Sequence, residues 1–97
     1  MPLFATTYRY ADDTVESRDA TRPAHREYLG ELATNGSLAL SGPFVGGADG
    51  ALLVFEAATP DDVQALIDAD PFVVEGLVAE ITVREWQAVL GRLAQHV

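Results

Sequence analysis

The chain has 97 residues and a formal net charge of -9, with six arginines, no lysine and no cysteine. This length suits one modest hydrophobic core, so we expect a single domain over residues 1–97. The acidic charge leaves no basic stripe for a phosphate backbone and repels anionic lipid surfaces, which argues against nucleic acid and membrane partners. The absence of cysteine excludes disulfides, thiolate metal sites and a cysteine nucleophile.

The N-terminal segment MPLFATTYRY lacks the basic region, the long apolar region and the cleavage site of a secretory signal. No apolar run approaches the roughly 18 residues that cross a bilayer. We therefore expect a soluble protein of the cytoplasm.

The first two expected elements are a strand and a helix. Leu3 to Tyr10 is rich in aromatic and threonine residues, which predicts a strand. Asp19 and Thr21 are both plausible N-caps and Pro23 suits a first helical turn, so we expect a helix that starts near Arg22. Its apolar positions recur at helical spacing and are Tyr28, Leu29, Leu32 and Ala33.

Two further strands and a second helix follow in the sequence. Ser37 to Phe44 and Ala51 to Ala58 are typical of strands, and a glycine-rich hairpin loop joins them. Thr59 is a favourable N-cap, with proline and two acids in the first turn after it. Pro71 restricts the residue before it, so this helix should end by Ala69 or Asp70.

A short helical turn at Phe72 to Glu75 and a fourth strand at Leu77 to Trp86 complete the order β-α-β-β-α-β. This order predicts an α+β, ferredoxin-like βαββαβ fold, with an antiparallel four-stranded sheet and two helices on one face. The segment beyond Trp86 either extends the last strand past a bulge or begins a terminal helix.

The open face of this sheet predicts a homodimer. In the third strand Ala51, Leu53 and Phe55 lie on one side, whereas Leu52 and Val54 lie on the other. The helices cover only one side, and a large apolar patch is unusual on a soluble monomer. We therefore expect two subunits to dimerise through the sheet.

His25 is a candidate proton-handling residue. It precedes Tyr28, Leu29 and Leu32 by three, four and seven positions, so it lies on the same helix face as these core residues. One reading is a core histidine satisfied by a backbone carbonyl. In the other, the positive end of the helix dipole favours the neutral imidazole, which accepts a proton.

Asp70 is the second candidate, because it follows Val63 by seven positions and an acid is unexpected on the core side of a helix. It either caps the short turn after Pro71 or holds the His25 ring and stabilises its cation. The two predicted helices lie side by side, so the pair is geometrically possible.

Other residues are candidates for binding rather than chemistry. Ser41 offers a hydroxyl and Gly42 a close backbone approach, although Gly-Pro after a strand is ordinarily a turn. Arg22 either binds a carboxylate or is solvated. Tyr8 and Tyr10 are expected as ordinary core or surface residues. The predicted substrate-binding residues are Ser41, Gly42, Pro43, Arg22 and Phe72.

Metal and cofactor sites have little support in the sequence. The two histidines are far apart, and the sequence has no cluster of acids and histidines at ligand spacing. We expect no metal and no cofactor, and a disordered chain end that includes His96.

Four segments together resemble the YCII-related (YciI-like) family: RPAHREYL, SGPF, DADPFVVEGL and ITVREW. The resemblance spans nearly the whole chain up to Trp86. It implies a dimeric ferredoxin-like fold related to muconolactone isomerase and other dimeric α/β-barrel proteins. It also implies an active site on a His-Asp pair, which corresponds to His25 and Asp70, with Ser41 and Gly42 in the same pocket.

The resemblance further implies cofactor-independent acid-base chemistry on a small cyclic compound, as in a lyase or isomerase. In this reading His25 removes a proton, Asp70 supports the imidazolium, and Ser41 or nearby N–H groups hold an oxyanion. The alternative is a non-catalytic ligand-binding or accessory domain with the same pocket. A cofactor-free monooxygenase on the same fold rests on analogy alone.

Overall fold

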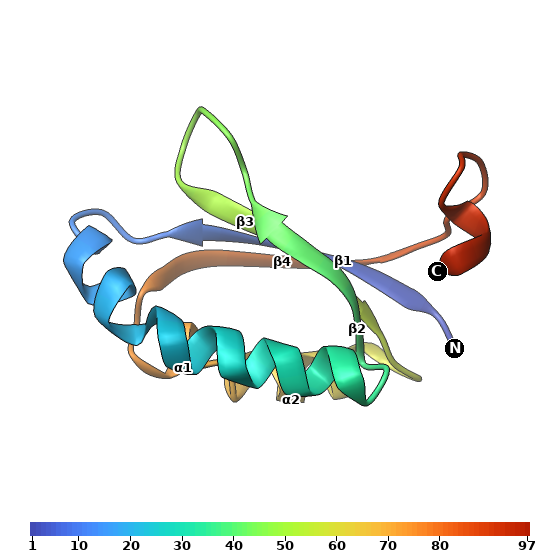
Figure 1. The fold of residues 1–97 in the computed structure, drawn as a ribbon, viewed down its shortest axis with the longest axis horizontal. Coiled ribbons are helices and arrows are strands. Elements are labelled where there is room, and N and C mark those ends of the chain that lie inside the picture. Colours follow the sequence, from blue (N-terminus) through green and yellow to red (C-terminus); the bar gives the residue numbers. More distant parts are fainter.

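The fold has two layers, a four-stranded antiparallel sheet and a layer of helices on one of its faces (Figure 1). The structure is a computed structural model that describes residues 1–97. The elements in chain order are β1 (Leu3–Tyr10), α1 (Val15–Thr34), β2 (Leu38–Pro43), β3 (Gly50–Glu56), α2 (Pro60–Asp68), α3 (Pro71–Val74), β4 (Val78–Trp86) and the 3-10 helix η1 (Ala94–His96).

The sheet has the strand order β2-β3-β1-β4, so β1 lies between the third and fourth strands of the chain. All three strand pairs are antiparallel. This arrangement confirms the predicted ferredoxin-like βαββαβ fold. Both long helices lie on one face, and the other face has no helix over the centre of the sheet (Figure 1).

Strand alternation decides which side chains enter the core between the sheet and the helices. In β1, Phe4 and Tyr8 face the helices, and the register places them opposite Phe55 and Ala51 of β3. Leu29 and Leu32 of α1 and Val63 and Ile67 of α2 close the core from the other side. The complete cluster is Phe4, Tyr8, Leu29, Leu32, Leu38, Ala51, Leu53, Phe55, Ala57, Val63 and Ile67.

Helix α1 is longer than predicted, and the expected start near Arg22 is wrong. The helix begins at Val15 with Thr14 in the N-cap position, so neither Asp19 nor Thr21 is a cap. Pro23 lies inside the helix on its exposed side, where it removes one backbone hydrogen bond. The first turn therefore does not contain His25, and the helix-dipole argument for its neutral form fails, because the dipole acts within a terminal turn.

The other elements lie within two residues of their predicted bounds, except for the segment after Trp86. This segment neither extends β4 nor forms an α-helix. It continues as irregular chain to η1, near the N-terminus of the molecule (Figure 1). His96 belongs to that turn, and its backbone N–H donates to the Leu93 carbonyl.

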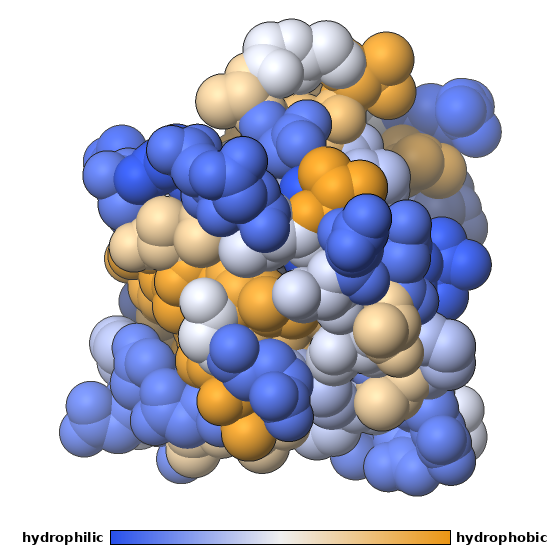
Figure 2. All heavy atoms as spheres, turned by 90° about the vertical axis from the view of Figure 1, so that its left-hand side faces the viewer, coloured by the Kyte–Doolittle hydropathy of each residue, from blue (hydrophilic) through white to orange (hydrophobic).

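The end of the molecule that carries the β1–α1 and β2–β3 loops is mainly hydrophilic, with smaller apolar areas between the hydrophilic residues (Figure 2). None of the helices combines the length and the apolar character needed to span a membrane.

Candidate functional site

Asp70 lies at the junction of α2 and α3. Pro71 disfavours helical backbone in the residue before it, so Asp70 is extended (φ -65°, ψ 125°) and α2 ends just before it. Asp70 is also the N-cap of α3, and its Oδ1 accepts a hydrogen bond from the Phe72 N–H at 2.9 Å. The residue is only 1% exposed. The local sequence thus fixes a carboxylate in the interior.

The buried Asp70 carboxylate receives hydrogen bonds on both oxygens. Its Oδ1 lies 2.7 Å from His25 Nδ1, in addition to its bond with the Phe72 N–H. Its Oδ2 accepts a hydrogen bond from the Tyr8 hydroxyl at 2.8 Å. Burying a charge is costly unless it is hydrogen-bonded, and these three donors provide that compensation. Both readings of Asp70 therefore hold geometrically, since it caps α3 and contacts His25.

The contact with Asp70 assigns the tautomer of His25. A carboxylate is an acceptor, so Nδ1 carries the proton and donates it, which leaves a lone pair on Nε2 in the neutral ring. No protein group bonds to Nε2, and Thr6 Oγ1 is the one fully buried side-chain polar atom without a partner. The Nε2 atom is therefore reachable from solvent, although the His25 side chain is only 12% exposed.

A stack of planar groups holds the His25 ring in place. The His25 and Phe72 rings are stacked with centroids 3.9 Å apart and planes 5° apart. Tyr10 meets Phe72 edge to face at 5.7 Å, and the Arg18 guanidinium lies 4.4 Å from the Tyr10 ring centroid. With one ring nitrogen bonded and one ring face covered, the orientation of the imidazole is fixed from two directions.

A cavity of about 300 Å³ adjoins this stack, between α1 and the strands β2 and β3. His25 is in its wall, whereas Asp70 lies behind His25 and does not line it. All five residues predicted to bind substrate are in the wall. The complete lining is Tyr10, Arg18, Arg22, His25, Arg26, Leu29, Ser41, Gly42, Pro43, Ala51, Leu53 and Phe72.

The surroundings also raise the pKa values of two tyrosine hydroxyls at this site. The pKa of Tyr8 is raised far above its ordinary value, first by burial and then by the negative charge of Asp70. Tyr8 therefore keeps its proton and remains a donor to Asp70. The pKa of Tyr10 is raised by burial, and the positive charges of Arg18 and Arg22 oppose this rise.

Sequence reasoning missed Tyr8, Tyr10, Arg18 and Arg26 as residues of this site. Tyr8 was predicted as an ordinary core or surface residue; it is buried, and its hydroxyl also bonds to Asp70. A usable signal was present for the arginines, because Arg18, Arg22 and Arg26 are spaced by four residues and share one helix side. The wrong helix start placed Arg18 outside the helix and hid this spacing.

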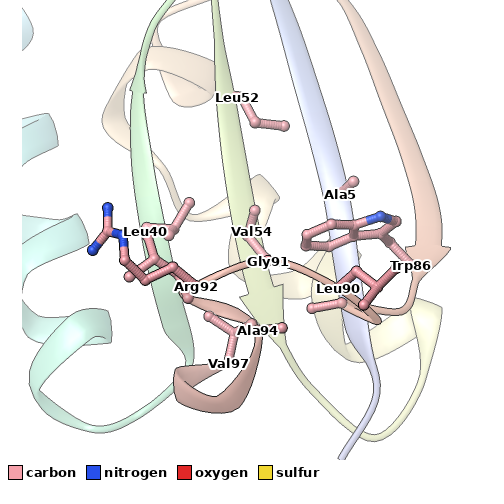
Figure 3. A pocket seen from close by; sticks show the side chains of 12 residues that line it. Ala5, Leu40, Leu52, Val54, Trp86, Leu90, Gly91, Arg92, Ala94 and Val97 are labelled. Carbon is pink, nitrogen blue, oxygen red and sulfur yellow. The ribbon is translucent and has the colours of Figure 1, made fainter.

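A second hollow, of about 440 Å³, lies on the open face of the sheet (Figure 3). Leu40, Leu52, Val54 and Ala5 form its floor, and the segment after Trp86 forms its rim. Its lining is almost entirely apolar, so it offers no acid-base group. Elsewhere, no three His, Cys, Asp or Glu side chains come together as metal ligands.

Comparisons with known proteins agree with this architecture. The family model described as the YCII-related domain matches residues 2–87. The proteins named YciI from Escherichia coli O6:H1 and from Shigella flexneri are each 30% identical to the chain over 86 residues. These alignments cover 79% of this chain and 88% of each relative.

Two solved structures are similar in fold. One is 5-chloro-2-hydroxyhydroquinone dehydrochlorinase (TftG) from Burkholderia phenoliruptrix AC1100, solved in complex with 2,5-dihydroxybenzoquinone. Its TM-score is 0.78 at 27% identity, over 87% of this chain and 92% of that one. Protein Atu4242 from Agrobacterium tumefaciens has a TM-score of 0.52 at 14% identity, over 89% and 91% of the two chains, and shows the fold alone. On the family match and the shared fold, the chain belongs to the YCII family.

Proposed function

We propose that the protein is a small-molecule enzyme that uses His25 as a general base and Asp70 as its positioning partner, without a cofactor. The observation that carries this proposal is the 2.7 Å contact between His25 Nδ1 and Asp70 Oδ1 at the wall of the 300 Å³ cavity. A general base needs an accessible lone pair and a fixed orientation. Nε2 of His25 has both.

The proposed step is the removal of a proton from a small cyclic substrate in a lyase or isomerase reaction. Nε2 takes the proton, and the electron pair of the broken bond stays on the substrate. In an elimination of hydrogen chloride, chloride leaves with the electron pair of its bond to carbon. The imidazolium that forms is stabilised by the Asp70 carboxylate, as in other His-Asp pairs.

Ser41 is the proposed donor to an oxygen that gains negative charge during this step. It lies across the cavity from α1, at a position of β2 paired with Leu53. Its hydroxyl makes no hydrogen bond within the protein, so it is free to donate to a ligand. The adjacent Gly42 lines the cavity with its backbone, because its side-chain position is paired with Leu52 and faces the open side of the sheet.

The structural neighbour supports the reaction class. The Burkholderia protein is named as a dehydrochlorinase and was solved with a six-membered ring compound, 2,5-dihydroxybenzoquinone. A cavity of about 300 Å³ is at the small end of the range for ligand pockets, which fits a ligand of one ring.

The test uses 5-chloro-2-hydroxyhydroquinone as the probe, with chloride release measured by an ion-selective electrode under argon. The variants are His25→Gln and, as a matched control, His96→Gln in the exposed turn η1. We expect chloride release from the wild type and from His96→Gln. His25→Gln should be slower by about 10² to 10⁴, the usual contribution of a general base, with an unchanged circular dichroism spectrum.

Equal rates for wild type and His25→Gln would refute the role of His25. If the wild type binds the probe but releases no chloride, the alternative of a non-catalytic ligand-binding or accessory domain is favoured. Unfolding of His25→Gln would instead assign His25 to packing against Phe72.

We also propose that the whole chain, as a single domain over residues 1–97, works as a homodimer through the open face of the sheet. The floor of the hollow on this face is apolar (Figure 3). Leu40 and Trp86 beside it are about half exposed, which is a poor arrangement for an isolated subunit in water. The site lies on the opposite face, so dimerisation would leave the cavity open.

A further inference from the structure

The cavity beside His25 concentrates positive charge in an acidic protein. Arg18, Arg22 and Arg26 all line it, which is half of the six basic residues in a chain with 15 acids. No Asp or Glu is part of the lining. The net charge of the cavity lining is thus positive, whereas that of the whole molecule is negative.

The three guanidinium groups differ in what already holds them. Arg18 is buried and structural, because it bonds to Thr14 and Asp49 and covers the Tyr10 ring. Arg22 is paired only with the exposed Asp19, three residues earlier on the same helix. Such surface pairs contribute little and exchange readily with other partners.

Arg26 has no partner within the protein. It is exposed at the edge of the cavity and makes neither an ion pair nor a hydrogen bond. Arg22 and Arg26 are four residues apart, and like charges at that spacing destabilise a helix slightly. The N–H donors of Arg26 are therefore available to a ligand, and an anion between the two guanidinium groups would offset their repulsion.

On the assumption that this cavity is the substrate site proposed above, we infer that its substrate is a small ring compound that carries an ionised oxygen group, a carboxylate or a phenolate. The guanidinium groups of Arg26 and Arg22 bind this oxyanion at the mouth of the cavity, since arginine matches such groups with paired N–H donors. The ring then lies deeper, against the apolar side chains of Phe72, Leu53 and Pro43.

The net charge of the whole chain opposes the approach of an anionic substrate, and the local arginines counter that repulsion. A net charge of -9 repels anions at a distance, and only a local cluster of cations reverses the sign of the potential within a Debye length. The affinity for an anion should therefore fall as salt is added, whereas that for a neutral ring should not.

Binding can be tested without turnover by following the backbone amide NMR signals of Gly42 and Phe72 in the full chain. The probes are benzoate, 4-nitrophenolate at a pH where it is ionised, and benzamide as a neutral ring of similar shape. We expect at least one of the two anions to bind about tenfold or more tightly than benzamide, and the tighter one identifies the oxyanion.

Three variants test whether Arg26 itself binds the anion. Arg26→Gln should weaken binding of the anion about tenfold and leave benzamide unchanged, and Arg26→Lys should restore part of the loss because it keeps the charge. Arg84→Gln is the matched control, since Arg84 is exposed on the open face of the sheet and outside the cavity. It should bind all three probes as the wild type does.

Equal affinity for anions and benzamide, no shift of the Gly42 and Phe72 signals, or equal effects of Arg26→Gln and Arg84→Gln would each overturn the inference. These outcomes are separate from the test of the reaction. Chloride release that depends on His25 but no preference for anions would leave the reaction in place and remove this substrate class. A preference for anions with no role for His25 in turnover would leave this substrate class in place and remove the proposed reaction.

Discussion

At the residue scale, the site depends on a chain of three side chains from three elements. Tyr8 of β1 bonds to Asp70, which bonds to His25 of α1. Asp70 is held by its own backbone position before Pro71, so it is the fixed centre of the chain. A donor lost at either end leaves a buried carboxylate with less compensation, which costs stability as well as function.

Tyr8→Phe tests this chain through its dependence on pH. Burial, followed by the charge of Asp70, raises the pKa of Tyr8 in the folded protein above its ordinary value of 10.0. Below pH 10.0 Tyr8 keeps its proton in both the folded and the unfolded protein, and the bond to Asp70 should make the wild type more stable than Tyr8→Phe by about 1 to 3 kcal/mol. Above pH 10.0 Tyr8 loses its proton in the unfolded protein but not in the folded one, so the wild type loses stability as pH rises.

The free energy of unfolding in urea, measured from about pH 8 to about pH 11, checks this expectation. The advantage of the wild type should shrink above pH 10.0 by up to about 1.4 kcal/mol per pH unit, the value for one proton. Tyr10 and Tyr28 also have raised pKa values, but they are present in both proteins and cancel. A constant difference over this range would contradict the titration assigned to Tyr8.

The sequence predicted the pairing of His25 with Asp70 but not the hydrogen bond from Tyr8 that supports it. His25 and Asp70 could be paired because one lies at core spacing on a helix and the other is an acid on a core face. Tyr8 could not, because alternation says which face of a strand a tyrosine occupies and not where its hydroxyl ends. That position depends on how far α3 lies above β1, which is a tertiary distance.

At the element scale, caps were predictable and the proline in α1 was misleading. Thr59 accepts a hydrogen bond from the Asp62 N–H at 3.2 Å, as expected for the start of α2. Pro23 follows the same rule in sequence, yet α1 begins before it, where the buried Arg18 bonds to Thr14 and Asp49 and ties the first turns to the rest of the fold. Local preferences fix an element's end only where packing does not override them.

Gly50→Ala tests the close contact of β3 with β1. A Cβ at Gly50 would overlap the carbonyl oxygen of Tyr8, a backbone atom that cannot turn aside. We expect destabilisation of about 3 kcal/mol, the upper end for overpacking. The disturbance should reach the site, because Tyr8 is the donor to Asp70.

The control is Gly30→Ala in the middle of α1, where a Cβ would meet nothing. This change should stabilise the protein by about 0.5 to 1 kcal/mol, because alanine loses less backbone freedom than glycine in a helix. Thermal unfolding of both variants is the measurement. Equal effects of the two substitutions would show that the approach of β3 to β1 is not tight.

At the scale of the whole molecule, the two faces of the sheet differ in what covers them. One face carries the core, the helices and the cavity with its arginines. The other is covered only in part by the segment after Trp86, whose Leu90 is 91% exposed. Apart from Gln87, this segment lies beyond the family match, which ends at residue 87. The sequence predicted an apolar open face from the alternation in β3, but the position of this segment followed from no local pattern.

Leu52→Glu tests whether a second copy covers that face. Leu52 lies on the floor of the apolar hollow and is partly buried already in one subunit (Figure 3). In a dimer closed by the sheet, the two new carboxylates would be buried without partners, at a cost to the dimer of about 3 kcal/mol or more in total. The dissociation constant of the dimer should then rise roughly 100-fold.

Sedimentation velocity measures whether each protein is a dimer or a single subunit. The wild type should sediment at twice the 10.4 kDa mass of the subunit, and Leu52→Glu should shift toward the single subunit at the same concentration. Val74→Glu is the matched control, because Val74 is an exposed apolar residue on the helix side. A wild type that sediments as one subunit would show that the open face has another function. A dimer that tolerates Leu52→Glu would place the interface elsewhere, since two added charges cannot be buried there without loss.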